Sequence, residues 1–275
     1  MKNFTRSLPH QANYNRVSSM GSVLTGIVLT KNEEKNIKRA LVSLSFCDEI
    51  LVVDDESSDK TVQIAASMGA IMIRHKLNNN FSAQRNFALQ KSRGDWILFL
   101  DADEQVSSEL KEEIVSLIKN KTLKNVSYYI KRRDYFWGRE LYYGDTVHVR
   151  SKGLIRLMKK NSGSWVSPVH ETFRSFAPIG QLEGYINHYP HQNVREFLQD
   201  INHYSTLRAK ELFKKGITTN IILILLYPFG KFFWTYFFQL GFLDGPAGFI
   251  YAFMMSFHSF LVRAKLYQYR RIDFE

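Results

Sequence analysis

The chain has 275 residues, of which 45% are hydrophobic and 23% charged, proportions that support a sizeable core and exclude a miniprotein or a globally disordered chain. Lysine and arginine outnumber aspartate and glutamate by 37 to 26, and the resulting net charge of +11 favours an anionic partner such as a phosphate ligand, a nucleic acid or an acidic membrane. A single cysteine, Cys47, excludes an intramolecular disulfide, and the N-terminus has no apolar secretory signal, so we expect a cytoplasmic location.

Apolar segments alternate with segments of helical periodicity from Gly21 onward. The first 20 residues are polar and without periodicity, and we expect a flexible leader there. The patterns predict strands at 23–29, 49–53, 70–73 and 96–100, and helices at 33–44, 59–68, 82–91 and 107–119. This alternation is typical of an α/β fold with a mostly parallel central sheet.

The pattern weakens after residue 125. We expect a strand at 126–132, loops around Trp165 and Pro168, and a helix at about 194–215. Between Lys131 and Lys160 there are nine lysines or arginines against three acidic residues, interleaved with aromatic residues. Such a segment is compatible with nucleic acid or with a solvated basic face, but we favour a groove for a phosphorylated glycolipid, because arginine pairs with phosphate and aromatic rings stack on sugars.

The C-terminal segment is rich in aromatic residues, with 14 between Tyr227 and Phe260. Three successive stretches, 216–230, 232–243 and 245–262, contain no acidic or basic residue and are flanked by lysine and arginine. This composition predicts amphipathic or hydrophobic helices that lie in a membrane interface. A buried helical hairpin and a true membrane span are the alternatives.

Polar residues follow the predicted strands, where an open parallel sheet binds its ligands. These residues are Thr30-Lys-Asn-Glu-Glu34, Asp54-Asp-Glu-Ser-Ser-Asp59, Gln84-Arg-Asn86 and Asp101-Ala-Asp-Glu104. The chain has neither a Gly-x-Gly-x-x-Gly motif nor a P-loop, which argues against a dinucleotide oxidoreductase and a P-loop phosphohydrolase.

The carboxylates of Asp101 and Asp103 lie two residues apart after an apolar strand and can face the same side of an extended segment. Such a pair can hold Mg²⁺ or Mn²⁺, which complete their coordination with substrate phosphates. Capping of the following helix is the alternative. Asp54 can accept a hydrogen bond from a base N–H or cap a helix, and Arg85 can approach a phosphate or only keep a helix face soluble.

Taken together, four segments resemble, in order and spacing, the family 2 inverting glycosyltransferases: 30–33, 53–59, 81–86 and 94–104. The chain is most similar to the bacterial lipopolysaccharide-core β-glucosyltransferase branch, because it also has Val169-His-Glu171 and a Gly-Phe-Leu-Asp-Gly segment at 241–245. The strong motifs cover about residues 23 to 104, and the tail similarity is looser.

The resemblance implies a GT-A-type nucleotide-sugar-binding domain that uses a UDP-sugar and Mg²⁺ or Mn²⁺. It implies nucleoside contacts from four residues: Thr30, Asn32, Glu33 and Asp54.

Carried over by position, Arg85 lies near the diphosphate or the sugar, and Asp103 is the direct metal ligand, with Asp101 beside the ribose or the metal. Glu171 is the implied catalytic base, and His170 next to it is expected to orient the acceptor or contact the diphosphate. Glu56 stands where the motif often has glycine, which predicts a turn of altered shape.

The chemistry itself also requires two acidic sites. A carboxylate-held cation stabilises the departing diphosphate, and a separate base takes the proton of the acceptor hydroxyl. The resemblance implies transfer of a sugar, with glucose favoured, from UDP to a lipid-linked glycan such as lipopolysaccharide core. The enzyme would be peripheral on the cytoplasmic face of the inner membrane, with no nucleic acid as partner.

Within this scheme, residues 1–20 form the leader, 21–125 bind the nucleotide-sugar, 126–200 supply the acceptor side with the base, and 201–275 form the helical tail. Three other functions remain open: transfer to a polyprenyl phosphate or polysaccharide, nucleotidyl transfer, and an inactive nucleotide-binding membrane scaffold. A nucleotidyltransferase would carry a glycine-rich basic loop after its first strand, which residues 30–34 do not resemble.

Overall fold

The computed structural model describes residues 22–120, 122–168, 171–191 and 193–271. The leader expected at 1–20 lies outside these residues. In chain order, the first half contains β1 (Leu24–Thr30), α1 (Ile37–Ser43), β2 (Glu49–Asp54), α2 (Thr61–Ser67), β3 (Ile71–Arg74), α3 (Phe81–Lys91), β4 (Trp96–Asp101), β5 (Glu104–Val106) and α4 (Ser108–Lys119). The second half contains β6 (Ser127–Phe136), β7 (Arg139–Leu141), η1 (Gly144–Thr146), α5 (Val147–Ser151), β8 (Leu154–Lys159), β9 (Gly163–Val166), β10 (Thr172–Ser175), β11 (Ile179–His188), α6 (Val194–Lys214), α7 (Ile221–Phe233), the π-helical turn η2 (Trp234–Phe238), η3 (Gly241–Asp244) and α8 (Gly245–Arg271).

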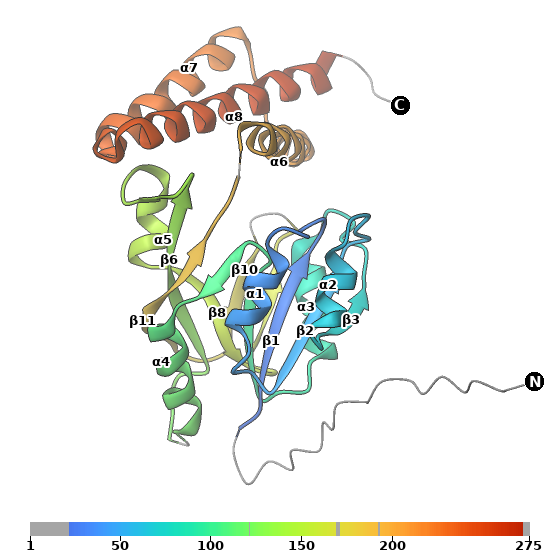
Figure 1. Cartoon of the computed structure of the whole chain (residues 1–275). Helices are drawn as coiled ribbons and strands as arrows, with labels where there is room; N and C mark the ends of the chain where they lie inside the picture. The colour runs from blue at the N-terminus through green and yellow to red at the C-terminus, as the bar shows by residue number, and fades with distance from the viewer. Residues whose placement is uncertain (1–21, 121, 169–170, 192, 272–275) are drawn as a thin grey trace, which may run out of the picture.

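The main sheet has the strand order β3-β2-β1-β4-β8-β6-β11-β5, and β7 pairs with β6. Strands β1 to β4 are parallel to one another, β8 enters antiparallel between β4 and β6, and β11 pairs parallel with β6. The predicted α/β fold, with a mixed and mostly parallel sheet followed by C-terminal helices, is confirmed (Figure 1).

Helices cover both faces of the parallel strands, which explains why these strands read as continuous apolar runs. On one face, Val28 belongs to a buried cluster with Leu41 of α1 and Ile114 of α4. On the other face, Phe99 belongs to a second cluster with Ala88 of α3. Both clusters hold the strands between two layers of helices.

The strands between residues 133 and 166 were not predicted. Strand β6 continues to Phe136 and turns through Trp137 and Gly138, whose φ angles are 49° and 79°. Two successive positive φ angles are typical of a tight hairpin turn, which usually has asparagine or aspartate before the glycine. A tryptophan at that position and the run Lys131-Arg-Arg133 in the strand conceal the hairpin from a reading of the sequence.

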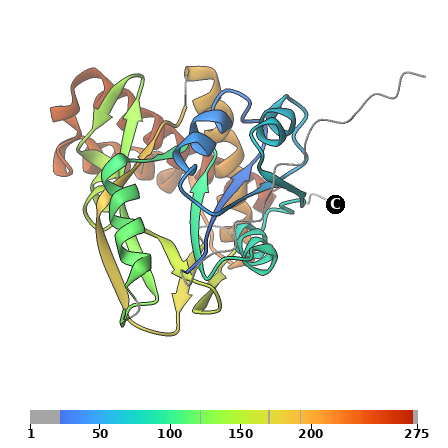
Figure 2. The ribbon, with the colours of Figure 1, turned by 60° about the horizontal axis from the view of Figure 1, so that its bottom comes forward.

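The C-terminal helices gather at one end of the molecule, beside the carboxyl ends of the parallel strands (Figure 1), and the turned view again shows α7 and α8 together on one side of the body (Figure 2). Helix α6 packs against α8, and α8 against α7. The ammonium of Lys35, in the loop after β1, lies 3.0 Å from a carboxylate oxygen of Glu196 on α6. Helix α6 therefore contacts the edge where the strands end.

The tail is attached to the body by buried and partly buried polar contacts. The carboxylate of Asp244 accepts hydrogen bonds from the backbone N–H groups of Tyr142 at 3.1 Å and Tyr143 at 2.9 Å. Lys231 of α7 pairs with Asp145 at 2.6 Å. The segment 241–245, singled out in the sequence, thus joins the tail to the β6–β7 hairpin.

Two tail segments, Ile221–Phe238 and Gly241–Arg271, are long and apolar enough to cross a membrane by length and composition, with mean hydropathies of 1.6 and 1.3. Only 11% and 22% of their most apolar windows are buried; the strongly exposed apolar side chains lie mainly on α7 and η2, while most of α8 is half-buried.

Candidate functional site

The ends of β1 and β2 place two of the predicted residues side by side. Thr30 and Asp54 are paired in the register of the two strands, and both are buried. One oxygen of Asp54 accepts the N–H of Ser57 at 3.1 Å. Among the described residues, the other Asp54 oxygen and the Thr30 hydroxyl have no hydrogen-bond partner. Buried polar atoms are normally paired, so these two suit an incoming ligand.

The loop after β1 and the loop after β2 are held together through Asn32. Its backbone N–H donates to the Ser57 hydroxyl, and its side-chain oxygen accepts the N–H of Ser58, both at 2.8 Å. Glu56 has a φ of 56°, which is the left-handed conformation that glycine adopts readily. The altered backbone expected from the missing glycine is therefore not found at this residue.

Glu33 lies in a partly buried position next to these loops. Its backbone N–H donates to the Thr61 hydroxyl at 2.7 Å, and its carboxylate accepts the Asn36 amide at 2.8 Å. Burial, followed by the negative charge of Asp103, raises the pKa of Glu33 to about 7. Near neutral pH this side chain is thus poised between an acceptor and a donor of hydrogen bonds.

Arg85 joins three segments that are distant in the sequence. From α3, its Nε donates to Glu171 at 2.8 Å and its Nη2 donates to Asp101 at 3.0 Å. The guanidinium lies 5.3 Å from the ring centroid of Phe99 and 4.8 Å from that of Trp165. The remaining Nη1 is buried and has no partner among the residues described, which leaves a donor for an anionic ligand.

Two contacts of α3 position the segment that leads to Glu171. The side chain of Asn86 both donates to and accepts from the backbone of Trp165, at 2.9 Å in each case. The N–H of Phe81 donates to the carbonyl of Pro168 at 2.9 Å. The segment 81–86 therefore fixes β9 and the loop after it. His170 lies outside the described residues.

Asp101, at the end of β4, lies between two arginines. Its second oxygen accepts Nη2 of Arg156 at 2.6 Å, and the same Nη2 donates to Glu104 at 3.0 Å. Burial alone would favour the neutral carboxyl, but Arg156 and Arg85 hold the pKa of Asp101 well below its usual range. Both oxygens of Asp101 thus anchor arginines. Arg156 was missed in the sequence because its strand, β8, was not recognised.

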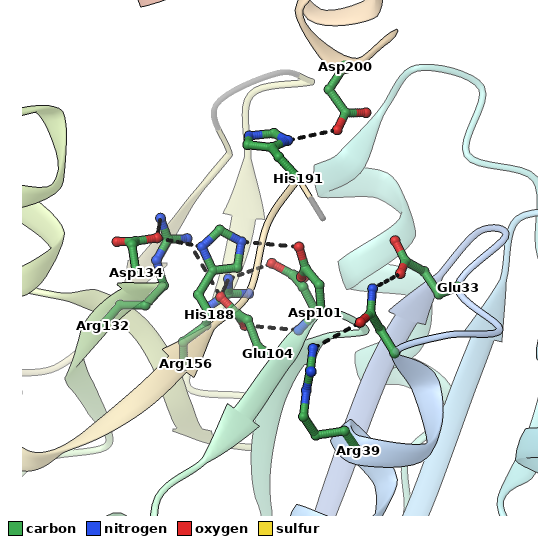
Figure 3. Close-up of polar contacts among 12 residues, drawn as sticks. Glu33, Arg39, Asp101, Glu104, Arg132, Asp134, Arg156, His188, His191 and Asp200 are labelled. Atoms are coloured by element: carbon green, nitrogen blue, oxygen red, sulfur yellow. Dashed lines mark hydrogen bonds and ion pairs between the residues drawn. The ribbon is translucent and has the colours of Figure 1, made fainter. Parts of the chain in front are cut away.

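Asp103 contacts a histidine, His188, that was not among the residues expected at the site. Nε2 of His188, the last residue of β11, lies 3.1 Å from Oδ2 of Asp103, and Nδ1 lies 2.5 Å from Asp134 (Figure 3). Burial and the nearby Arg132 oppose the charged ring, but the two carboxylates raise the pKa of His188 to about 9. His188 lies at the end of a strand, a position that could have identified it had β11 been predicted.

Asp103 and His188 can hold a hard divalent cation only when the His188 ring is neutral, so the cation would replace the proton between Nε2 and Asp103. Ligands at adjacent corners of a Mg²⁺ octahedron lie about 3 Å apart when each bond is about 2.1 Å, close to the 3.1 Å between Oδ2 and Nε2. Within the described ranges, no group of three or more His, Cys, Asp or Glu side chains is arranged to hold a metal alone. A metal here would depend on oxygen atoms of a substrate, as Mg²⁺ commonly does.

Helix α6 lies above this edge of the sheet. Oδ2 of Asp200 lies 3.0 Å from Nδ1 of His191, and Figure 3 shows Asp200 above Asp101 and Glu33. Glu196, Asp200 and Tyr204 lie four residues apart on one face of this helix. Burial and the negative charges of Asp200, Asp101, Asp103 and Glu171 raise the pKa of Tyr204. Its half-exposed ring therefore borders the same space.

The family model described as Glycosyl transferase family 2 matches residues 25–177. An uncharacterized glycosyltransferase of Rickettsia bellii (strain RML369-C) is 30% identical over 259 residues, which cover 88% of this chain and 85% of that protein. The lipopolysaccharide core biosynthesis glycosyltransferase LpsC of Rhizobium meliloti (strain 1021) is 28% identical over 253 residues, covering 89% of this chain and 92% of that protein.

Among solved structures, S. aureus TarS 1-349 in complex with UDP-GlcNAc is 17% identical, with a TM-score of 0.45, and the match covers 90% of this chain and 92% of that one. The glucosyl-3-phosphoglycerate synthase of Mycobacterium tuberculosis is 16% identical, with a TM-score of 0.46 and coverage of 73% and 82%.

Proposed function

Since the chain belongs to glycosyl transferase family 2 and is a glycosyltransferase, we propose that it transfers a sugar, with glucose as first candidate, from a UDP-sugar to a lipid-linked glycan by a single inverting displacement. The observation that carries this proposal is that Arg85 and Glu171, which form an ion pair, lie at the same edge of the sheet as Asp103. The similarity to LpsC, whose name refers to lipopolysaccharide core biosynthesis, supports lipopolysaccharide core as the acceptor.

In this proposal the nucleoside binds over the ends of β1 and β2. The unpartnered oxygen of Asp54 accepts the ring N–H of uracil, and Thr30 offers its hydroxyl beside it. Asn32 holds the two loops together, and Glu33 is placed to contact the nucleoside from the loop after β1. Residues 21–125 thereby serve as the donor-binding part of the chain.

Asp103 and His188 would hold Mg²⁺ or Mn²⁺, with Asp101 beside them. Once bound, this cation would supply positive charge to the diphosphate as it departs. The fixed arginines contribute from the chain itself: Nη1 of Arg85 has no protein partner, and Arg156 keeps Asp101 ionised and oriented. Such preorganised positive charge stabilises the charge that develops on a leaving group.

The transfer step needs a base opposite the leaving group. The carboxylate of Glu171 accepts the proton of the acceptor hydroxyl while that oxygen forms its bond to the anomeric carbon. The bond from the anomeric carbon to the diphosphate breaks, and its electron pair leaves on UDP. Arg85 holds Glu171 through a single N–H at 2.8 Å and so positions the base without bonding both of its oxygens.

The acceptor would enter between the sheet edge and α6. On the side of residues 126–200, cationic and aromatic side chains stack in pairs: the guanidinium of Arg133 lies 3.8 Å from the ring centroid of Tyr185, and that of Arg150 lies 4.1 Å from Tyr142. These groups suit a phosphorylated glycan, which would share both arginines with the carboxylate of Glu140. Tyr204 of α6 provides a further, half-exposed ring.

The tail, residues 201–275, would hold the enzyme on the cytoplasmic face of the inner membrane. Large apolar side chains of α7 and η2 are strongly exposed, including Ile221 at 64%, Phe229 at 63% and Phe238 at 74%. An exposed apolar surface of this kind rimmed by lysine and arginine suits an interface with lipid headgroups.

A screen of nucleotide-sugars by thermal unfolding, with and without Mn²⁺, tests the donor. A ligand that binds only the folded state raises the unfolding temperature. We expect UDP and one UDP-sugar to raise it in the presence of Mn²⁺, and Asp54→Ala to reduce the shift. Stabilisation by a nucleotide of another base in preference to UDP would contradict the proposal.

A further inference from the structure

An apolar groove runs along α7, apart from the residues of the sheet edge. Its volume is about 470 Å³, within the range of about 300 to 1,000 Å³ for small-molecule sites. The lining residues share one stripe of α7 and its continuation, with one addition from α8: Leu223, Leu226, Tyr227, Gly230, Lys231, Trp234 and Ser259. Spacings of three and four residues place such side chains on one helix face.

The dimensions of this groove suit a single hydrocarbon chain. From Leu223 to Trp234 the stripe spans about 16 Å at a helical rise of about 1.5 Å per residue, comparable with one leaflet, about 15 Å, of a hydrocarbon core about 30 Å thick. Midway along the stripe, a Cβ atom added at Gly230 would meet nothing within 4 Å. The absence of a side chain there keeps the floor of the groove open.

A cation lies beside the half of the groove nearer Leu223. The guanidinium of Arg263 lies 3.7 Å from the ring centroid of Tyr227, and Arg263 follows the groove residue Ser259 by one helical turn. The Ser256 hydroxyl donates to the carbonyl of Pro228 at 2.8 Å. Because α7 and α8 run antiparallel, Arg263, seven residues beyond Ser256, lies level with the start of α7.

The charge of Arg263 is not neutralised by the protein. Among the residues that the structure describes, no carboxylate lies within salt-bridge distance of Arg263. Further exposed cations share the end where α6 and α8 terminate: Lys214, Arg270 and Arg271. An occupant with an apolar chain and a negative head would match both the groove and its rim.

We propose that this groove binds one anionic membrane lipid, with the headgroup phosphate on Arg263 beside Tyr227 and an acyl chain lying along the groove toward Trp234. The site is separate from sugar transfer, so it can exist whether or not the proposed function is correct. The groove would prefer anionic lipids to neutral ones, whereas an apolar hairpin that simply inserts into the membrane would show no such preference.

Trp234 makes the proposal measurable, since it lines the groove and its fluorescence is quenched by bromine on a nearby acyl chain. The full-length protein is bound at saturating lipid to vesicles in which a minority of the lipid is brominated, either phosphatidylglycerol or phosphatidylcholine. Trp234→Phe defines the share of the signal that belongs to Trp234. Gly230→Leu fills the groove with the side chain of a residue that favours helix. Sedimentation with vesicles measures, independently of fluorescence, whether each variant still binds membranes.

For the wild-type protein we expect stronger quenching of Trp234 by brominated phosphatidylglycerol than by brominated phosphatidylcholine. Gly230→Leu should lose this difference yet still sediment with vesicles, and Arg263→Gln should reduce the preference about fivefold, the effect of about 1 kcal/mol for one cation at a lipid surface. Arg270→Gln, an exposed cation at the same end but outside the groove, is the matched control and should keep the preference.

Equal quenching by the two lipids, or unchanged quenching in Gly230→Leu, would overturn the proposal and leave only general insertion. Equal losses in Arg263→Gln and Arg270→Gln would overturn it as well, because the charge would then act without a site. A self-associated protein whose Trp234 is not quenched would show that a second copy covers the groove.

Discussion

The guanidinium of Arg85 links Asp101 and Glu171, donating through Nη2 to the first at 3.0 Å and through Nε to the second at 2.8 Å. One side chain on α3 thus connects the end of a central strand with the segment after β9. In the proposed mechanism, this contact fixes the distance between the base, Glu171, and the strand end that lies beside the leaving diphosphate.

Glu171→Gln tests the base. Glutamine keeps an oxygen for Nε of Arg85 but cannot take a proton from the acceptor hydroxyl. We expect turnover to fall by roughly 10²- to 10⁴-fold with little change in the affinity for UDP, measured by sugar-transfer kinetics and by titration with UDP. Turnover close to that of the wild-type protein would remove Glu171 from this role.

The raised pKa of Glu33 predicts a pH dependence of stability. Its ordinary value is 4.5 and the folded value is about 7, so the folded state holds the proton more tightly. The contribution to stability is therefore fully present below about pH 4.5 and is lost as the pH rises through about 7. Glu33→Gln should remove this loss and become more stable than the wild-type protein by up to about 3 kcal/mol at alkaline pH.

Chemical denaturation of both proteins at several pH values, with EDTA present, measures this difference. The advantage of Glu33→Gln should grow between about pH 5 and pH 8 and then level off. A difference that does not vary with pH would show that Glu33 keeps its ordinary pKa in the folded protein.

Glu56 predicts a stabilising substitution. Its φ of 56° costs about 1 kcal/mol or more for a residue with a side chain, against a smaller entropic cost for glycine. Glu56→Gly should raise the free energy of unfolding by about 0.5 to 1 kcal/mol. Glu56→Ala is the control, because it also removes the exposed contact with Lys76 at 3.3 Å but keeps the strain. Equal stabilities of the two variants would contradict this explanation.

Asp244 predicts how firmly the tail is attached. Asp244→Ala leaves the N–H groups of Tyr142 and Tyr143 without their acceptor, at a cost of about 1 to 3 kcal/mol. Limited proteolysis should then cut the tail faster, whereas Asp244→Asn, which keeps one oxygen, should be cut at an intermediate rate. Cleavage of Asp244→Ala at the wild-type rate would mean that other contacts hold the tail.

The parallel half of the fold could be predicted from the sequence because its strands are apolar throughout and end in polar residues. Arg85, Asp101 and Glu171 were expected at one site, and the structure brings them together. The antiparallel half was harder to predict, since β6 and β8 carry cations whose carboxylate partners lie on other strands. Arg156 and His188 belong to the site because they contact Asp101 and Asp103. Contacts of this kind between distant strands leave no pattern in a single sequence.

The most direct test of the central claim is to measure metal-dependent sugar transfer by the wild-type protein and by Asp103→Ala. UDP release from UDP-glucose is measured with a membrane glycolipid extract as acceptor, with Mn²⁺ or EDTA, for the wild-type protein and this variant. We predict turnover that requires Mn²⁺ in the wild-type protein and is abolished in Asp103→Ala, while thermal unfolding shows that the variant is folded. Unchanged turnover in Asp103→Ala would contradict the assignment of this aspartate to the departing diphosphate.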